Sequence, residues 1–139
     1  MRDWKLSDDV DGLRRFCGVV MEAAGDRIAV VKPQSGFFER LGPPGLSELA
    51  GAVATIREQG ALRIIDCKRG DVIGSMEGYA EAMLGPHSGF GGDAMTVTAY
   101  LGLGALRPVL DRMQGGGIRS CALIKSRRAL TARRPARRR

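Results

Sequence analysis

The sequence predicts an α/β fold in which a parallel sheet is covered by helices. Stretches with apolar residues at helical spacing alternate with short apolar, β-branched runs, in the order helix, strand, helix, strand, helix, strand, helix. Successive strands begin roughly 32 to 34 residues apart, the length of one repeating unit. Doubly wound sheets and eight-stranded barrels share this pattern. A Gly-rich phosphate loop after the first strand would be more typical of the doubly wound class, and the chain has none there.

The first helix is expected over residues 8–24, with Ser7 or Asp8 as its N-cap. The first strand is expected at residues 28–32, as a buried run of apolar and β-branched residues. Pro33 follows it directly. Because proline favours an extended preceding residue and has no backbone N–H, we expect strand pairing to end at this point.

The later elements are predicted in the same way. A loop containing Gly42, Pro43, Pro44 and Gly45 should precede a second helix that begins near Leu46 and is ended by Gly60. A second strand is expected at residues 62–66, a third helix at about 75–84 and a third strand at about 94–98. A fourth helix should carry residues 106–113, with Pro108 in its first turn.

Charge is distributed unevenly along the chain, whose net charge is +7. Nine of the 22 basic residues lie between Arg119 and Arg139, where there is no acid, so the first 118 residues carry 13 basic against 15 acidic side chains, a net charge of −2. The basic end has three interpretations: a nucleic-acid-binding tail, a solvated disordered end, or translation out of the ancestral frame after a single-base deletion near the Gly115 codon. We expect the last, and a nucleic-acid partner is not expected.

The cysteines and the histidine give no metal motif. Cys17, Cys67 and Cys121 lie far apart without a CxxC pair, and His87 is the one histidine, in a Gly-Pro-His-Ser-Gly loop. No apolar run approaches the ~20 residues that span a bilayer, and no signal sequence opens the chain. We therefore expect a reduced, cytoplasmic protein without a membrane partner.

Charged residues close two of the predicted strands. Lys32 ends the first, and Asp66 ends the second and begins the run that contains Lys68 and Asp71. Each could be a solvated loop charge, but ligands of parallel α/β folds gather at the carboxyl ends of strands. Four side chains of alternating sign should converge there at one rim of the sheet. Such an array keeps both carboxylates ionised and places a positive group where negative charge develops in a reaction.

At these residues the chain resembles the orotidine 5'-phosphate decarboxylase family, in the branch with a Lys-Pro-Gln strand end. Three segments carry the resemblance: Val-Lys-Pro-Gln-Ser-Gly-Phe-Phe-Glu at 31–39, the D-x-K-x-x-D motif at 66–71, and Thr-Val-Thr-Ala-Tyr-Leu-Gly at 96–102. The D-x-K-x-x-D motif alone is moderately specific. It becomes strong where it closes an apolar strand about 34 residues after the Lys-Pro-Gln strand end.

The resemblance implies a (β/α)8 barrel, the TIM-barrel fold, and covers about residues 4–117. Since such a barrel typically needs about 250 residues, we expect a partial one here, with about strands two to four in a domain of residues 1–117. Residues 118–139 would form the basic tail. With both ends of the barrel missing, the isolated chain is expected to be weakly active or inactive.

The resemblance also implies roles for individual residues. Lys68 would stabilise the carbanion at C6 of the pyrimidine and protonate it, and Asp66 would lie against the departing carboxylate. Lys32 would hold the network and reach the ribose. Asp71 would enter the site of a neighbouring subunit, and Ser75 would contact the substrate across the same homodimer interface. The family uses neither metal nor organic cofactor, and its partner is a nucleotide substrate.

Two alternatives remain at this point. Related barrels that act on hexulose or ketogulonate phosphates share D-x-K-x-x-D but use a metal held by acids at neighbouring strand ends, where this chain has Lys32. The other alternative is an inactive remnant whose basic tail binds nucleic acid without sequence preference.

Overall fold

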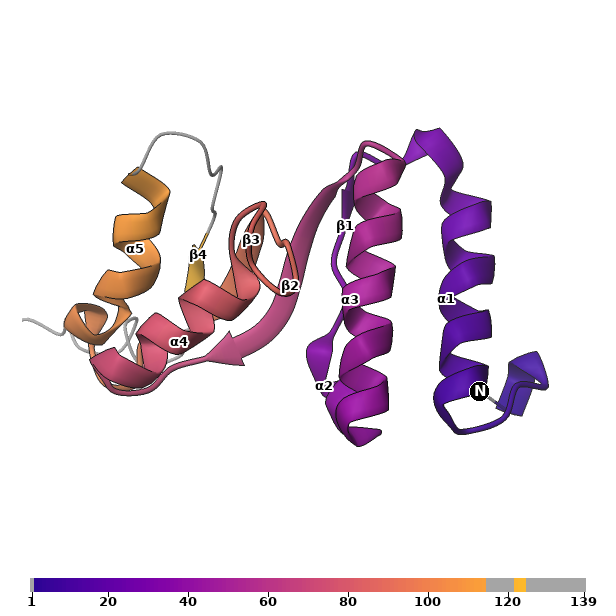
Figure 1. Ribbon diagram of the computed structural model, residues 1–139, viewed down its shortest axis with the longest axis horizontal. Helices are drawn as coiled ribbons and strands as arrows, with labels where there is room; N and C mark the ends of the chain where they lie inside the picture. The colour runs from indigo at the N-terminus through magenta and orange to yellow at the C-terminus, as the bar shows by residue number, and fades with distance from the viewer. Residues whose placement is uncertain (1, 115–121, 125–139) are drawn as a thin grey trace, which may run out of the picture.

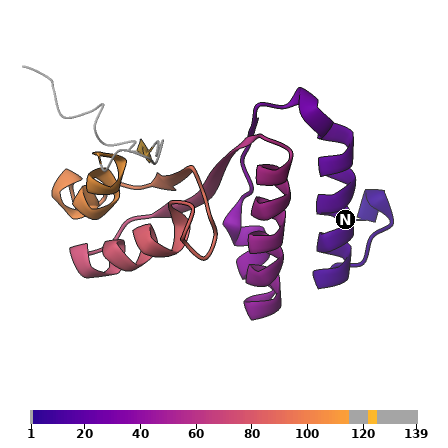
Figure 2. The ribbon, with the colours of Figure 1, turned by 45° about the horizontal axis from the view of Figure 1, so that its top comes forward.

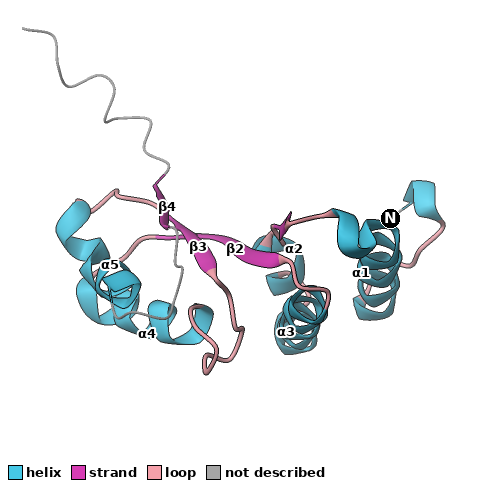
Figure 3. Ribbon diagram, turned by 90° about the horizontal axis from the view of Figure 1, so that it is seen from above, coloured by secondary structure: helices cyan, strands magenta, loops and turns pink. Residues whose placement is uncertain are grey.

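Four parallel strands form one sheet in the order in which they occur along the chain: β1 (Val30–Val31), β2 (Leu62–Arg69), β3 (Ala94–Val97) and β4 (Ala122–Ile124). The structure is a computed structural model that describes residues 2–114 and 122–124. Helices α1, α3, α4 and α5 lie on one side of these strands (Figure 3). Doubly wound sheets reverse their strand order and carry helices on both faces, so this arrangement is part of a (β/α)8 barrel, as expected.

The helices pack as two neighbouring pairs. Figures 1 and 2 show α1 beside α3 at one end of the sheet and α4 beside α5 at the other, with the long strand β2 between them. The bounds are α1 Val10–Ala24, α2 Ser35–Glu39, α3 Gly42–Glu58, α4 Ile73–Met83 and α5 Arg107–Gln114, with 3-10 turns at Arg2–Trp4, Gly25–Arg27 and Leu103–Leu106.

The cap of α1 lies one residue later than expected. The Asp9 side chain accepts a hydrogen bond from the backbone N–H of Gly12 at 2.9 Å, and Asp9 has the extended backbone that an N-cap requires. Ser7 instead donates its hydroxyl to the Asp9 carboxylate at 2.7 Å. The expectation of Ser7 or Asp8 as the cap was wrong, because neighbouring polar residues of the same type are indistinguishable by spacing.

The first strand is shorter and more exposed than its sequence suggests. Of residues 28–32, only Val30 and Val31 form β1, and Ile28 and Val30 are 44% and 43% exposed. β1 is the edge strand of the described sheet and pairs with β2 alone. Pairing also continues beyond Pro33, whose carbonyl accepts the Asp66 N–H at 2.9 Å. Proline lacks a donor but keeps its acceptor, so the expectation that it ends the pairing was wrong.

Between β1 and β2 the chain forms more helix than expected. Residues Gly42 to Gly45 belong to the first turn of α3, with prolines at its first positions, where the missing N–H groups would have no partner within the helix. The short helix α2 was not predicted. The predicted end at Gly60 is confirmed: Gly60 has a φ of +78° and donates its N–H to the Arg57 carbonyl at 2.9 Å.

The core lies between the sheet and its helices. Its largest fully buried side chains come from every layer: Leu49, Val53 and Ile56 of α3, Ile65 of β2, Met76 of α4, Leu84, Met95 and Val97 of β3, Leu106, and Val109 of α5. Ile65 and Met95 face each other in the register of β2 and β3 and fix the two strands that carry the site. No helix in residues 2–114 is both long and apolar enough to cross a membrane.

Candidate active site

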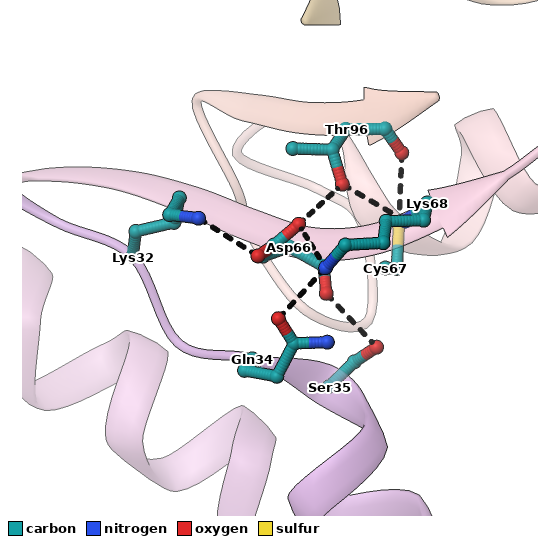
Figure 4. Close-up of polar contacts among 7 residues, drawn as sticks. All are labelled: Lys32, Gln34, Ser35, Asp66, Cys67, Lys68 and Thr96. Carbon is teal, nitrogen blue, oxygen red and sulfur yellow. Dashed lines mark hydrogen bonds and ion pairs between the residues drawn. The ribbon is translucent and has the colours of Figure 1, made fainter. Parts of the chain in front are cut away.

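Two lysines and one aspartate meet at the carboxyl ends of β1 and β2 (Figure 4). The Lys32 amino group lies 2.7 Å from Oδ2 of Asp66, and the Lys68 amino group lies 2.8 Å from Oδ1 of the same carboxylate. Two ammonium groups therefore approach one carboxylate from different sides. Lys32, Asp66 and Lys68 converge as the sequence predicted, and each lysine side chain is about half exposed.

Asp66 is 4% exposed and keeps its negative charge in that environment. Burial alone would raise the pKa of its carboxyl group, but hydrogen bonds from Lys32, Lys68 and Thr96 outweigh burial and hold the pKa well below the ordinary aspartate value. The cluster thus holds a buried carboxylate between two half-exposed ammonium groups, and fixed charges of this kind can stabilise charge that develops in a transition state.

A bulge in β2 sets the position of Lys68. Ile65 pairs with Met95 and Arg69 pairs with Val97, so three residues of β2 stand opposite Thr96 alone. Lys68 has a φ of +50°, a left-handed conformation that costs a residue with a side chain on the order of 1–3 kcal/mol. Bulges of this kind re-aim side chains next to functional sites. The bulge also explains why β2 runs to Arg69, three residues beyond its predicted end.

Three further polar residues surround the cluster and were not predicted as site residues. The Lys68 amino group donates to Oε1 of Gln34 at 2.8 Å, the Thr96 hydroxyl donates to Oδ1 of Asp66 at 2.8 Å, and the Ser35 hydroxyl donates to the Asp66 carbonyl at 3.4 Å. Gln34 and Ser35 follow Lys32 by two and three residues, so the motif that drew attention to Lys32 also contained its neighbours.

Asp71 and Ser75 do not join the cluster within this chain. The Asp71 carboxylate accepts the N–H of Val72 at 2.7 Å, and no ion pair joins it to Lys32 or Lys68 among the described residues. Ser75 lies in the first turn of α4, partly buried. Within this chain, the convergence expected at one rim of the sheet is therefore seen for Lys32, Asp66 and Lys68 and not for Asp71.

Comparison with known proteins agrees with this geometry. A family model described as "Orotidine 5'-phosphate decarboxylase / HUMPS family" matches residues 6–132. The chain belongs to this family. The chain is 49% identical over 125 residues to an orotidine 5'-phosphate decarboxylase of Salinispora tropica, covering 88% of this chain and 45% of that protein. Against the Myxococcus xanthus enzyme of the same name it is 47% identical over 123 residues, covering 88% and 43%.

A solved structure shows the same backbone arrangement. The putative orotidine 5'-phosphate decarboxylase from Streptomyces avermitilis matches with a TM-score of 0.84 and 46% identity, over 88% of this chain and 42% of that one. The chain spans less than half the length of these relatives. The family match continues to residue 132, whereas the sequence motifs suggested an end near 117, and β4 lies in that additional part. A change of reading frame near Gly115 would end the similarity there, but the family match continues past that residue. The role of residues 118–139 stays a prediction.

Cys67 lies between Asp66 and Lys68 in the sequence, and its side chain packs into the core instead of the cluster. It is 8% exposed, belongs to the main core cluster, and its Sγ lies 3.5 Å from the Thr96 carbonyl. Burial raises the pKa of its thiol, which keeps it protonated and unreactive. Cys67 therefore packs behind the site, and His87 is an exposed turn residue.

Arg69 supports the carboxyl end of β2 from the side. Its guanidinium lies 2.5 Å from the Glu39 carboxylate of α2 and 5.1 Å from the centre of the Tyr79 ring of α4. Arg69 therefore ties two helices to the strand that carries Asp66 and Lys68. Its Nε is buried without a hydrogen-bond partner among the described residues.

Proposed function

We propose that this chain supplies the decarboxylating cluster of an orotidine 5'-phosphate decarboxylase, which converts orotidine 5'-phosphate to UMP and CO2 in de novo pyrimidine biosynthesis. The observation that carries the proposal is the shared carboxylate of Asp66, which pairs with both Lys32 and Lys68. The names of relatives up to 49% identical to the chain support the same reaction.

The reaction breaks the bond between C6 of the pyrimidine and its carboxylate, and CO2 leaves while the electron pair stays on C6. The Lys68 ammonium lies beside C6, stabilises this pair and donates a proton to it, and the resulting amine recovers a proton from water. Asp66 lies against the departing carboxylate. Lys32 holds Asp66 and reaches the ribose.

Charge stabilisation of the carbanion, rather than repulsion of the substrate carboxylate, supplies most of the rate in this proposal. Two ammonium groups and the Thr96 hydroxyl lie against the Asp66 carboxylate, so much of its charge is already compensated before substrate binds. The repulsion between Asp66 and the carboxylate of the substrate is therefore weakened. Removing one preorganised donor at such a site typically costs about 2.7–4 kcal/mol of transition-state stabilisation.

The proposal includes a homodimer with shared active sites. Among the described residues Asp71 makes no ion pair with Lys32 or Lys68 of its own chain, and it is followed by Val72 and Ile73, which are 59% and 53% exposed. Tyr100 and Leu101, after the neighbouring strand, are 83% and 52% exposed. Exposed apolar side chains beside a site are typical of surfaces that bind another protein. If this apolar surface packs against a second copy of the chain, Asp71 and Ser75 would lie at the interface and reach the cluster of the partner.

The metal-dependent sugar-phosphate reaction of related barrels fits these residues less well. A divalent cation would need acidic ligands at the strand ends, but the first strand ends in Lys32 and both Asp66 oxygens already bind ammonium groups. No three His, Cys, Asp or Glu residues within 2–114 gather as metal ligands would. The ammonium groups of Lys32 and Lys68 on the Asp66 carboxylate therefore favour decarboxylation without a metal or organic cofactor.

The proposed function is tested in a chimera in which residues 2–132 of this chain, which include the family match at 6–132, replace the corresponding segment of the Salinispora tropica relative. The chimera should deplete the absorbance of orotidine 5'-phosphate. Lys68→Ala should lower kcat by about 100-fold or more, because it removes both the stabilising charge and the proton donor. The 139-residue chain is assayed beside it.

Lys5→Ala is the matched control. Lys5 is an exposed lysine that also has a left-handed backbone, with a φ of 53°, and it lies outside the cluster. The kcat of the Lys5→Ala chimera should stay within about twofold of the kcat of the unaltered chimera. A folded chimera that leaves orotidine 5'-phosphate intact, or a Lys68→Ala variant as fast as its parent, overturns the proposal.

A further inference from the structure

Thr96 occupies a position in which one hydroxyl contacts both functional residues of β2. Its side chain is buried at 4% exposure in β3. Oγ1 lies 2.8 Å from Oδ1 of Asp66 and 2.8 Å from the backbone nitrogen of Lys68 (Figure 4). A single buried hydroxyl therefore takes part in two hydrogen bonds, one with the Asp66 carboxylate and one with the main chain of Lys68, the proposed proton donor.

The direction of both hydrogen bonds follows from the chemistry of the groups. A backbone N–H can only donate and an ionised carboxylate can only accept. The Thr96 hydroxyl consequently gives its one hydrogen to Asp66 and accepts the Lys68 N–H with a lone pair. Hydrogen bonds to a charged group are the stronger kind, and in a chain of donors each bond polarises the next.

The bulge in β2 makes this threonine necessary. Between the pairs Ile65–Met95 and Arg69–Val97 the strand ladder is interrupted, and the Lys68 N–H points to a side chain where a regular strand would offer a carbonyl. A buried N–H without an acceptor is costly, and Lys68 already holds a disfavoured left-handed backbone. The Thr96 side chain replaces the missing acceptor and stabilises the conformation that aims Lys68 at Asp66.

We infer that Thr96 is a positioning residue of the decarboxylation site, which sets the plane of the Asp66 carboxylate and the backbone of Lys68 through the same hydroxyl. The inference rests on the proposed function for its effect on rate. Its structural part stands alone, because the hydrogen bond to the Lys68 N–H can be measured without substrate. Thr96 acts through Asp66 and Lys68 and is not itself assigned a contact with substrate.

The test compares Thr96→Val, which keeps the shape and removes the hydroxyl, with Thr96→Ser, which keeps the hydroxyl and removes a methyl group. In the chimera, Thr96→Val should lower kcat by about tenfold or more with a smaller change in KM, and Thr96→Ser should retain kcat within about threefold. In the 139-residue chain, amide hydrogen exchange at Lys68 should be slow and should become at least about tenfold faster in Thr96→Val. Thr55→Val, the same change on the exposed side of α3, is the control.

Each outcome decides the inference. Equal loss of kcat in the valine and serine variants assigns the effect to packing and overturns it, as does a valine variant with unchanged kcat. Should Thr96→Val fail to fold, a Lys68 amide that exchanges freely in the unaltered chain overturns the inference, and a protected one with an active serine variant supports it. A protected Lys68 amide in a chimera without decarboxylase activity refutes the proposed function alone.

Discussion

Asp66 couples the charge of the site to the stability of the fold. Its pKa lies below the ordinary value of 3.8: burial opposes ionisation, and the hydrogen bonds from Lys32, Lys68 and Thr96 overcome it. A carboxyl group whose pKa is depressed by folding stabilises the folded state at all pH values above its unfolded pKa. That stabilisation is lost as the pH falls through the folded value. The cluster should therefore matter most to stability at neutral pH.

Asp66→Asn in the 139-residue chain tests this coupling. At pH 7 the variant should lose about 1–3 kcal/mol of unfolding free energy, because two ammonium groups are left without their shared carboxylate. Below about pH 4 the difference should begin to shrink, since the unfolded chain takes up a proton at Asp66 while the folded chain keeps the carboxylate ionised. Urea unfolding at pH 7 and pH 3 measures both values. Asp26→Asn, at an exposed position, should change stability by less than about 0.5 kcal/mol, and a loss in Asp66→Asn that is equal at both pH values contradicts the argument.

Individual site residues were predictable where their chemistry is unusual for their place in the chain. Lys32, Asp66 and Lys68 stand out because charged side chains end apolar strands. Thr96 does not stand out, since a β-branched residue in a strand is what the strand itself favours. Its role depends on the bulge at Lys68, and no local pattern in β2 predicts that three of its residues face one of β3.

At the scale of elements, the short helix α2 brings Glu39 to the strand that carries the site. The Glu39 carboxylate pairs with Arg69, whose guanidinium also packs on the Tyr79 ring of α4. The two charged side chains are about one-third exposed or less, 29% for Arg69 and 33% for Glu39. This pair should therefore contribute more than a fully solvated pair does, and it links three elements around Lys68 and Asp66.

Glu39→Ala should lower the unfolding free energy by about 1–2 kcal/mol, because Arg69 would keep a partly buried charge without its carboxylate. Thermal or urea unfolding of the 139-residue chain measures the loss. Asp111→Ala is the matched control, since it breaks the Arg107–Asp111 pair of α5, which has a separation of 3.6 Å and side chains 79% and 61% exposed. That variant should lose less than about 0.5 kcal/mol. Equal losses in the two variants would show that burial of the Arg69 pair adds nothing.

Elements with a strong repeating pattern were predicted, and those that depend on tertiary context were not. The helices α1, α3, α4 and α5 carry enough turns for their apolar spacing to be recognised. Helix α2 has five residues, too few for a period to be seen, and it follows Pro33, which favours extended backbone before it. The exposure of β1 depends on which strand lies beside it, which composition does not reveal.

At the scale of the whole molecule, strand order separates two folds that share one sequence pattern. Alternating helices and strands predict a parallel sheet, but the pattern along the chain is the same whether the sheet continues in one direction or reverses. The order β1-β2-β3-β4 settles this in favour of the barrel. The motif residues at the carboxyl ends anticipated that result, because they resembled a barrel family before any strand order was known.

The position of Asp71 leads to a test of the shared site in the dimer. If each site combines Lys68 of one subunit with Asp71 of the other, a Lys68→Ala chimera and an Asp71→Ala chimera should each be nearly inactive alone. After the two are unfolded together in equal amounts and refolded, half of the dimers should be mixed, and each mixed dimer contains one site with both residues intact. Activity should therefore recover to about one quarter of the unaltered chimera.

The complementation result distinguishes shared sites from sites built within one chain. Were Lys68 and Asp71 to act together in the same subunit, every site in the mixture would lack one of them, and refolding would restore nothing. Refolding each variant by itself is the control for recovery during handling. Recovery near one quarter requires the Asp71 carboxylate to cross the interface, in keeping with its separation from the Lys32–Asp66–Lys68 cluster within one chain.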